Sequence, residues 1–338
     1  MADGDRPFGW GVVGFGWVAR DYAVPGLLAS GGRLAAVFDP DAEAQRLAGE
    51  MGATAHPTLD ALLRDPAVEA IYVATPNHLH RAAVEAAAAA GVPVLCEKPM
   101  AATLTDAEAM AAAVERAGVL YGTAFDQRHH PAHVALREAI RGGLIGTVTA
   151  VRIAYCCWLG REWTSLPGHG NWRADAAQAG GGALMDLAPH GLDLTQFLLE
   201  EPVVEVVAMT QRRVQDYAVD DGAVILGRTA SGVLLQQHNS YNCPDALPRR
   251  RLEVLGSRGQ VVAENTMGQT AGGTLTHTDA AGVVAALPFG DQDVSPFARQ
   301  MAAFAAAARG APHDFSGARD IATMRLLHQA YASDPRCR

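Results

Sequence analysis

Short apolar runs alternate with segments of helical periodicity over residues 1–125. The runs are bounded by Gly, Pro or Asp, which is typical of strands buried on both faces of a parallel sheet. The predicted strands are Phe8–Val13, Leu34–Phe38, Ala53–Ala55, Ala70–Ala74, Val92–Cys96 and Val119–Thr123. The predicted helices are a stretch ending at about Ala29, then Asp41–Met51, Leu59–Leu63, Arg81–Ala90 and Asp106–Ala117. Strands joined by single helices form β-α-β units, so we expect an α/β domain with a Rossmann doubly wound parallel sheet.

Residues 126–338 have a different pattern, in which longer strand-like runs are joined by turn sequences such as Asp220-Asp221 and Ser231-Gly232. The predicted strands are Thr147–Cys156, Val203–Val214, Ala223–Thr229, Val233–Tyr241, Arg250–Leu255, Gln260–Glu264 and Thr274–Thr278. The predicted helices are His133–Arg141, Gly182–Leu199, Phe297–Arg309 and Ile321–Ala332, the last of them free to pack back on the first domain. We therefore expect a second, α+β domain with a large open, mainly antiparallel sheet for substrate binding and oligomerisation.

Length, charge and cysteine usage narrow the function classes. A chain of 338 residues suits two domains, and a formal charge of −9 argues against nucleic acid or an anionic membrane as the main partner. No apolar run is long enough to predict a membrane span, and the first residues lack the apolar core of a signal peptide. An odd number of cysteines without C-x-x-C spacing favours reduced thiols in the cytoplasm over disulfides or zinc. These cysteines are Cys96, Cys156, Cys157, Cys243 and Cys337.

A glycine pattern follows the first predicted strand and opens a helix. Gly14-Phe15-Gly16-Trp17-Val18-Ala19 has the form G-x-G-x-x-A, in which the glycines permit a tight turn and a close approach of pyrophosphate to the backbone. Asp39 ends the second predicted strand, where an acid suits a ribose 2′-hydroxyl and repels a 2′-phosphate. We therefore predict dinucleotide binding, with NAD favoured over NADP.

Two further stretches carry groups for proton chemistry. Lys98, in Glu97-Lys98-Pro99, follows a strand of the same sheet, so it is expected near the nicotinamide. Asp186 and His190 are four residues apart and share one face of a helix, where the carboxylate can orient the imidazole or share a substrate hydroxyl with it. Pro189 places this pair at the start of the helix. Taken alone, each stretch also has a purely structural interpretation. Lys98 could be an ordinary surface lysine, and Asp186 and His190 could be a structural hydrogen-bonded pair.

Taken together, these stretches resemble the Gfo/Idh/MocA family, which includes glucose–fructose oxidoreductase and inositol dehydrogenase. Residues 73–80, Val-Ala-Thr-Pro-Asn-His-Leu-His, resemble the loop that precedes the family's E-K-P stretch. Trp172-Arg173, followed by three glycines and D-x-x-x-H, resembles the signature of its second domain. The order and spacing of several such motifs make the resemblance specific, and it covers most of the chain.

The resemblance implies a role for each matching residue. Lys98, Asp186 and His190 are implied to be catalytic and to contact the substrate. The implied cofactor-binding residues are Gly14, Phe15, Gly16, Trp17, Val18, Asp39, Thr75, Pro76, Asn77, His80, Glu97, Lys98, Trp172 and Arg173. The resemblance further implies hydride transfer between NAD and a secondary alcohol or ketone carbon of a sugar, aminosugar or cyclitol. Either His190 or Lys98 could carry the proton, and the residues leave this choice open.

Several alternatives are weighed against this interpretation. Some relatives use NAD for redox-assisted glycoside hydrolysis and others are non-catalytic regulators, but the retained Lys98, Asp186 and His190 favour a dehydrogenase. His129-His130-x-x-His133 lacks a carboxylate or thiol at ligand spacing, so no metal is predicted. The aromatic loop from Tyr155 to His169, with Trp158 and Trp163, is either a lid or sugar platform or ordinary packing. We expect Tyr155 and Trp172 to contact the substrate.

The open sheet predicts the oligomeric state. One face of this sheet needs a cover, and the chain has too few helices to provide it. We therefore expect a homodimer or homotetramer formed through the sheet of the second domain.

Overall fold

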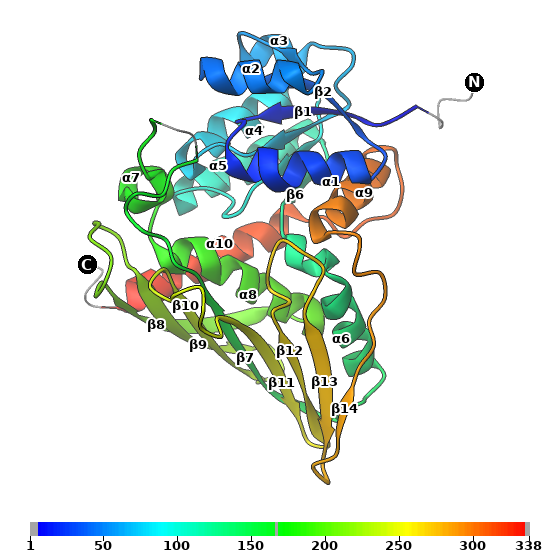
Figure 1. Ribbon diagram of the computed structural model, residues 1–338, viewed down its shortest axis with the longest axis vertical. Coiled ribbons are helices and arrows are strands. Elements are labelled where there is room, and N and C mark those ends of the chain that lie inside the picture. Colours follow the sequence, from blue (N-terminus) through cyan, green and yellow to red (C-terminus); the bar gives the residue numbers. More distant parts are fainter. Residues whose placement is uncertain (1–5, 166–167, 335–338) are drawn as a thin grey trace. The chain divides into compact units, whose positions relative to one another are not determined.

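The structure is a computed structural model, and it describes residues 6–165 and 168–334. The chain divides into two compact units (Figure 1). The first comprises Met1–Ala124, Thr164–Gly170 and Phe297–Ile321, and the second comprises Phe125–Trp163, Asn171–Pro296 and Ala322–Arg338. Each unit therefore contains segments that are far apart in the sequence.

The first unit is built on a six-stranded sheet in which all strand pairs are parallel. The strand order is β3-β2-β1-β4-β5-β6, the order of a Rossmann fold, which confirms the predicted fold class. Its strands are β1 (Gly9–Val13), β2 (Arg33–Phe38), β3 (Thr54–Ala55), β4 (Ala70–Val73), β5 (Val94–Cys96) and β6 (Tyr121–Thr123). Its helices are η2 (Ala19–Ala23), α1 (Val24–Ala29), α2 (Ala42–Glu50), α3 (Leu59–Leu63), η3 (Asn77–Leu79), α4 (His80–Ala89) and α5 (Leu104–Ala117).

The sequence determines these elements through burial and capping. All five residues of β1 and all four of β4 are buried, which explains why their apolar runs do not alternate with polar residues. Helices α2, α3 and α5 begin where a side-chain oxygen of Asp41, Thr58 or Thr103 accepts a backbone N–H one turn ahead. The strands whose ends carry the predicted site are thus buried on both faces of the sheet.

The second unit is built on an eight-stranded sheet of order β14-β13-β12-β11-β7-β10-β9-β8. Every pair in it is antiparallel except β10 with β7, so the predicted mainly antiparallel sheet is confirmed. Its strands are β7 (Val148–Cys156), β8 (Val203–Gln211), β9 (Gly222–Thr229), β10 (Leu234–Ser240), β11 (Arg250–Gly256), β12 (Gly259–Glu264), β13 (Thr274–Asp279) and β14 (Val284–Ala286). The short strand β14, exposed throughout, is absent from the sequence prediction because it contains no buried residue to set a pattern.

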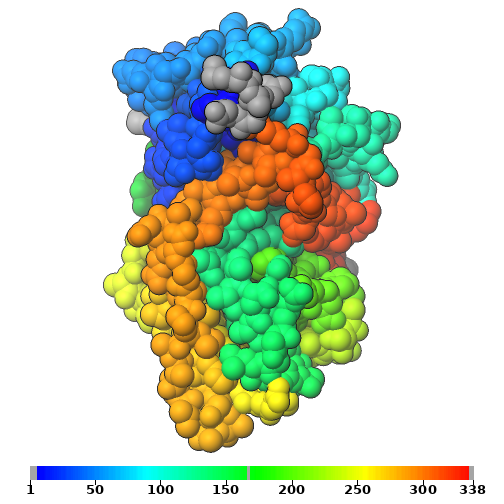
Figure 2. Space-filling view, turned by 90° about the vertical axis from the view of Figure 1, so that its right-hand side faces the viewer, coloured from blue at the N-terminus to red at the C-terminus, as the bar shows by residue number. Residues whose placement is uncertain are grey.

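Helices cover one face of this sheet. The helices that lie wholly in the second unit are η4 (Asp126–His129), α6 (Pro131–Arg141), η5 (Trp172–Ala174), α7 (Ala176–Ala179) and α8 (Ala183–Leu199). Helix α8 packs against β7, β8, β9 and β10, and α6 lies alongside the stretch that contains β13 and β14 (Figure 2). Helix α9 (Pro296–Ala308) lies almost wholly in the first unit, and α10 (Gly317–Ser333) begins in the first unit and ends in the second.

The position of Pro189 corrects one expectation. Helix α8 begins at Ala183, so Pro189 lies inside the helix rather than in its first turn. A proline there removes one backbone hydrogen bond, but α8 is buried along almost its whole length and its packing outweighs that loss. Asp186 is nevertheless in the first turn, and His190 lies one turn further along.

Candidate functional site

The glycine-rich loop follows β1 in the first unit. Gly14 has a φ of 86°, and a Cβ there would lie 2.8 Å from the backbone nitrogen of Thr75 in the neighbouring loop. Only glycine fits so close an approach in this conformation. Helical structure begins at Trp17, and the Arg20 N–H donates to the carbonyl oxygen of Gly16 at 3.0 Å. The loop therefore leads into a helix N-terminus, which is the arrangement that binds phosphate.

Asp39 lies beside this loop at the end of β2. Its Oδ2 accepts the Phe15 N–H at 2.7 Å, and its Oδ1 accepts the Asp41 N–H at 2.8 Å. The Phe15 side chain is fully buried in the core, so this residue contributes its backbone to the loop. These two hydrogen bonds fix the carboxylate of Asp39 against the glycine loop.

The stretch from Thr75 to His80 follows β4. His80 is fully buried, and its ring nitrogens lie 3.0 Å from the carbonyl oxygen of Thr75 and 3.2 Å from that of Pro99. Burial lowers the pKa of His80 to about 4, so the ring is neutral at ordinary pH. His80 thus links the loop after β4 to the loop after β5, and it leaves Thr75, Pro76 and Asn77 at the strand end.

Glu97 and Lys98 follow β5, the next strand of the sheet. The hydroxyl of Tyr72 on β4 donates to Oε1 of Glu97, and Oε2 of Glu97 accepts the Lys98 N–H at 3.3 Å. Glu97 is therefore held between two strands. The side chains of Glu97 and Lys98 are both partly exposed.

These strand ends together fit a dinucleotide. An acid, a glycine loop, a polar loop and a lysine follow β2, β1, β4 and β5, which are neighbours in the sheet. Ligands of open α/β sheets bind at this carboxyl edge. The close backbone approach at Gly14, the helix N-terminus beyond Gly16 and the fixed carboxylate of Asp39 suit a pyrophosphate and a ribose hydroxyl.

In the second unit, Asp220 and the glycines before α8 position the start of that helix. Oδ1 and Oδ2 of Asp220 accept the N–H groups of Gly182 and Leu184 at 2.9 and 2.8 Å, and the Tyr331 hydroxyl donates to Oδ1 at 2.7 Å. A Cβ on Gly182 would lie 1.9 Å from the carbonyl oxygen of Asp220, and one on Gly181 would lie 2.2 Å from the Tyr331 hydroxyl. The glycine run therefore permits close packing around a helix cap.

Asp186, in the first turn of α8, is held by an aromatic hydroxyl and a guanidinium. Tyr241 donates its hydroxyl to Oδ2 of Asp186 at 2.8 Å, and Nε of Arg173 lies 3.8 Å from the same oxygen. The guanidinium of Arg173 is 4.3 Å from the ring centroid of Trp172 and 4.4 Å from that of Trp163. Burial raises the pKa of Tyr241 well above its ordinary value, so this hydroxyl remains a donor.

His190 lies one turn further along α8 and is nearly buried. The ring of Tyr155, on β7, meets the imidazole edge-on with centroids 5.3 Å apart. Nδ1 of His190 is 3.5 Å from Oδ1 of Asp126, a residue of η4. The structure therefore brings Tyr155 and His190 together, and it groups Trp172, Arg173 and Asp186 in the same unit.

Two of the three histidines near η4, His130 and His133, anchor a helix and a loop. His130 caps α6 by accepting the Ala132 N–H, and the ring nitrogens of His133 lie 2.8 Å from the Gln127 carbonyl oxygen and 2.9 Å from the Thr266 hydroxyl. Among the described residues, no group of three or more His, Cys, Asp or Glu could hold a metal ion.

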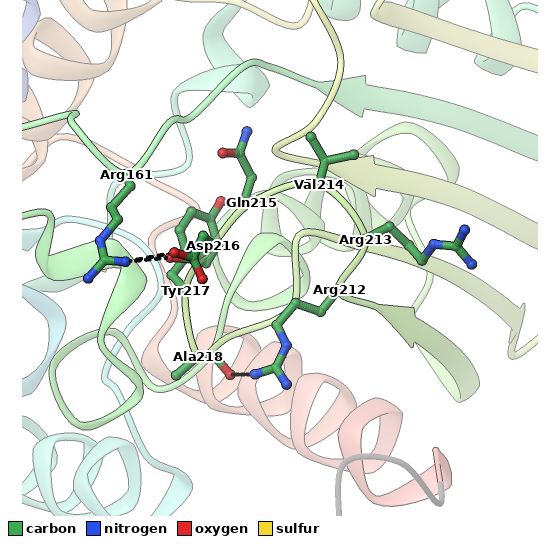
Figure 3. Close-up of a pocket in the computed structure, with 8 residues that line it drawn as sticks. All are labelled: Arg161, Arg212, Arg213, Val214, Gln215, Asp216, Tyr217 and Ala218. Carbon is green, nitrogen blue, oxygen red and sulfur yellow. Dashed lines mark hydrogen bonds and ion pairs between the residues drawn. The ribbon is translucent and has the colours of Figure 1, made fainter.

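A separate cavity of about 590 Å³ lies at the loop between β8 and β9 (Figure 3). It is lined by Arg161, Arg212, Arg213, Val214, Gln215, Asp216, Tyr217 and Ala218. Arg161 pairs with Asp216 at 2.9 Å, and Arg212 donates to the Ala218 carbonyl oxygen at 3.0 Å. Both arginines are therefore used in holding this exposed loop, and the cavity is not the predicted site.

Sequence reasoning missed four residues around α8: Asp126, Tyr241, Arg128 and Asp193. Arg128 forms a buried bidentate pair with Asp193, with both nitrogen–oxygen distances 2.7 Å. A buried aspartate three residues after His190, on a mostly apolar helix, was the available signal for this pair. Asp126 and Tyr241 had no such signal, because their partners lie 64 and 55 residues away in the sequence.

Comparisons with known proteins identify the family of both units. A family model described as an oxidoreductase family with an NAD-binding Rossmann fold matches residues 8–125, and the GFO/IDH/MocA C-terminal domain model matches residues 133–262. The chain is 36% identical to 1,5-anhydro-D-fructose reductase of Ensifer adhaerens, over 81% of this chain and 80% of that protein. It is 30% identical to inositol 2-dehydrogenase of Rhizobium meliloti, over 76% and 75% of the two chains.

Solved structures show the same fold over nearly the whole chain. Aldose-aldose oxidoreductase of Caulobacter crescentus superposes with a TM-score of 0.86 at 27% identity, covering 98% of this chain and 99% of that chain. Levoglucosan dehydrogenase in complex with NADH and levoglucosan has a TM-score of 0.83 at 21% identity, with 98% of each chain covered. The glycine loop, the E-K-P stretch and the D-x-x-x-H helix thus belong to a family fold that spans both units, and this chain is a member of the GFO/IDH/MocA family of oxidoreductases.

Proposed function

We propose that the protein is an NAD-dependent dehydrogenase or reductase acting on a secondary alcohol or ketone carbon of a sugar, aminosugar or cyclitol. One observation carries the proposal: a lysine at the cofactor edge of the first unit, and a carboxylate and an imidazole at the start of α8 in the second. Relatives named for anhydrofructose, inositol and levoglucosan support a polyhydroxylated substrate. Lys98, Asp186 and His190 act on this substrate in our proposal.

The first unit holds the cofactor in this proposal. The glycine loop and the helix that begins at Trp17 bind the pyrophosphate, Asp39 accepts from the adenosine ribose, and Thr75, Pro76 and Asn77 line the strand end. Glu97, Trp172 and Arg173 seat the nicotinamide half. We favour NAD over NADP because Asp39 would repel a 2′-phosphate, and because the nearby Arg46 is engaged by Glu43 at 2.6 and 2.8 Å. When bound, the nicotinamide supplies the acceptor or donor of hydride.

The side chains of the second unit manage the proton of the substrate hydroxyl. His190 accepts this proton during oxidation and returns it during reduction. Asp186, fixed by Tyr241 and Arg173, binds a neighbouring substrate hydroxyl. Lys98, as an ammonium, stabilises the developing charge on the substrate oxygen. In the alternative assignment, Lys98 is the proton carrier and His190 the stabilising group.

A substrate screen tests the proposed function. Purified protein with NAD⁺ is mixed with free cyclitols, hexoses, aminosugars and nucleotide-linked sugars, and the reduced cofactor is followed by its absorbance. We expect oxidation within one of these classes, and a slower rate with NADP⁺. Absence of both oxidation and the reverse reduction across all classes would contradict the proposal.

We also propose that the protein forms a homodimer or homotetramer through the open face of the second sheet. This face carries a contiguous apolar patch on β8, β9 and β10, because the strand register places Val207 opposite Leu226 and Met209 opposite Val224. Met209 is 69% exposed and Leu226 is 55% exposed in the isolated chain. Leu234 extends the patch on β10. Exposed apolar patches of this kind mark protein interfaces.

The oligomer is tested by sedimentation of two matched variants. Leu226→Glu places a charge inside the patch, and we expect it to dissociate the assembly. Val283→Glu adds the same charge at an exposed site in the turn between β13 and β14, and we expect it to leave the assembly intact. A wild-type monomer at micromolar concentration would exclude assembly through this face.

A cytoplasmic location is proposed from the thiols. The described cysteines, Cys96, Cys156, Cys157 and Cys243, are free, and Cys337 lies outside the described residues. Burial raises the pKa of Cys157 to about 12 and that of Cys96 well above its ordinary value, which keeps both thiols protonated. Such thiols suit a reducing compartment. Cell fractionation with an antibody to the protein tests this location.

A further inference from the structure

His190 lies close to a carboxylate that belongs to a different element. Asp126 belongs to η4, close to the first residue of the second unit, and its Oδ1 is 3.5 Å from Nδ1 of His190. The two residues are 4% and 6% exposed. An opposite charge at this distance in a nearly buried position interacts strongly with an imidazolium.

The carboxylate of Asp126 is itself held in place. Its Oδ2 accepts from Nε2 of Gln127 at 2.8 Å, and the same nitrogen lies 3.1 Å from the carbonyl oxygen of Gly268. Arg128, the next residue of η4, is fixed by its bidentate pair with Asp193. The segment that carries Asp126 is therefore anchored both to α8 and to the loop after β12.

The two ring nitrogens of His190 are consequently distinguished. A carboxylate at Nδ1 favours the tautomer with its proton on Nδ1, which leaves the lone pair on Nε2 to accept another proton. The edge-on ring of Tyr155 restricts rotation of the imidazole. Asp186 is engaged through Oδ2 by Tyr241 and approached by Arg173. The two carboxylates therefore have different partners.

We propose that Asp126 is the positioning residue for His190. It sets the tautomer of the imidazole and stabilises the imidazolium that forms when Nε2 takes the substrate proton, while Asp186 binds the substrate. This inference rests on the proposed function for its catalytic consequence, but the electrostatic coupling can be measured without any substrate.

Other ionisable groups in the second unit also lie near His190 or its partners, and they too can influence the protonation of its imidazole. They are Asp186 and Asp193 on α8, Arg128 on η4, Tyr155 on β7, and Arg250 on β11, whose guanidinium is 5.9 Å from the Tyr155 ring centroid. Asp193 is neutralised by Arg128, and burial raises the pKa of Tyr155, which keeps its phenol neutral. Asp126 is therefore the carboxylate whose removal should change His190 most directly.

The test is an NMR titration of the full-length protein with isotope-labelled histidine. The His190 signal is identified by its loss in His190→Gln. In Asp126→Asn, we expect the pKa of His190 to fall by about one unit or more, because the neighbouring negative charge is gone. Asp126→Glu keeps the charge and should retain most of the wild-type value. Asp216→Asn, at an exposed position of the same unit, should leave the titration unchanged.

Kinetics provide the second measurement. With a substrate from the screen, Asp126→Asn should lower kcat/KM by about 10- to 100-fold and move the acidic limb of its pH profile to lower pH. In a His190→Asn background, the same substitution should have little further effect. An unchanged His190 titration in Asp126→Asn would overturn the inference, whereas a shifted titration in a protein that oxidises no substrate would overturn only the proposed function.

Discussion

In the first unit, the proposed cofactor residues follow adjacent parallel strands, whereas in the second the proposed catalytic residues lie on one helix and are held by several separate segments. Asp39 is fixed by a backbone donor in the glycine loop after β1, and Glu97 by a side-chain donor on the neighbouring strand β4. Asp186 and His190 depend on Tyr241, Arg173 and Asp126, which come from three different segments of the second unit.

This difference shows how the two sets of proposed residues are specified. A parallel sheet places its strand ends at one edge by topology alone, so short local motifs are enough to locate the cofactor residues. The electrostatic surroundings of a helix on an antiparallel sheet, such as α8, are instead determined by the segments that pack against it. Apart from those at Lys98, substitutions in the first unit should therefore act mainly on cofactor binding, and those around α8 mainly on proton transfer.

The largest expected effect comes from the proton-transfer groups themselves. Lys98→Met and His190→Asn should each lower kcat/KM by roughly 10²- to 10⁴-fold, the usual contribution of a general acid or base. Loss of the pH-dependent limb in only one variant identifies the proton carrier. The NAD affinity of His190→Asn, measured by fluorescence titration, should remain close to that of wild type. A large loss of NAD affinity in that variant would contradict the assignment of cofactor binding to the first unit and proton transfer to α8.

Each unit contains a buried neutral histidine, which allows a matched test of acid sensitivity. Burial lowers the pKa of His80 to about 4 and that of His133 to about 3, from 6.5. A folded-state pKa below the unfolded value means that stability is fully present above pH 6.5 and is lost as the pH falls toward the folded pKa. For His80 this loss is about 3 kcal/mol.

Urea unfolding at about pH 7 and about pH 4 measures this loss. His80→Asn should reduce the acid sensitivity of the first unit, and His133→Asn that of the second. If either variant kept the full wild-type loss of stability at acid pH, the burial of that histidine would not be its cause.

A smaller effect is expected for cofactor choice. Asp39→Ser removes the carboxylate beside the glycine loop, so the preference for NAD over NADP should fall by about tenfold or more, or about 1.4 kcal/mol. Binding titrations with both reduced cofactors measure the change. Asp60→Asn, at an exposed position of α3, is the matched control and should keep the wild-type ratio.

An effect of similar size concerns the start of α8. Asp220→Ala removes the carboxylate that accepts the Gly182 and Leu184 N–H groups, which should cost about 1–2 kcal/mol of stability. Chemical unfolding measures the loss, and Asp216→Ala in the exposed loop nearby should cost much less. Equal losses in the two variants would show that the cap does not contribute.

Most of the fold, and the position of the candidate cofactor residues at strand ends, could be predicted from the sequence. Buried runs and turn residues predicted both sheets, and strand-end motifs indicated Asp39, Glu97 and Lys98. The pattern could not indicate that Asp220 caps α8, because its partners lie 36 and 38 residues earlier. Pro189 was misplaced by about a turn because local backbone chemistry favours a helix start, whereas tertiary packing keeps the helix intact.

The hydrogen bonds on the outer edge of strand β8 affect how copies of the protein can associate. Its outward N–H groups at Ala208 and Thr210 donate to the Ser333 hydroxyl and the Asp334 carboxylate, at 2.8 and 2.6 Å. A strand whose donors are already used is a poor template for another strand, so growth of the sheet into a fibril is disfavoured at this edge. A second molecule can therefore approach the apolar face of the sheet more readily than this edge. A two-fold contact through that face uses the same surface on both molecules, so it forms a closed dimer and not a polymer.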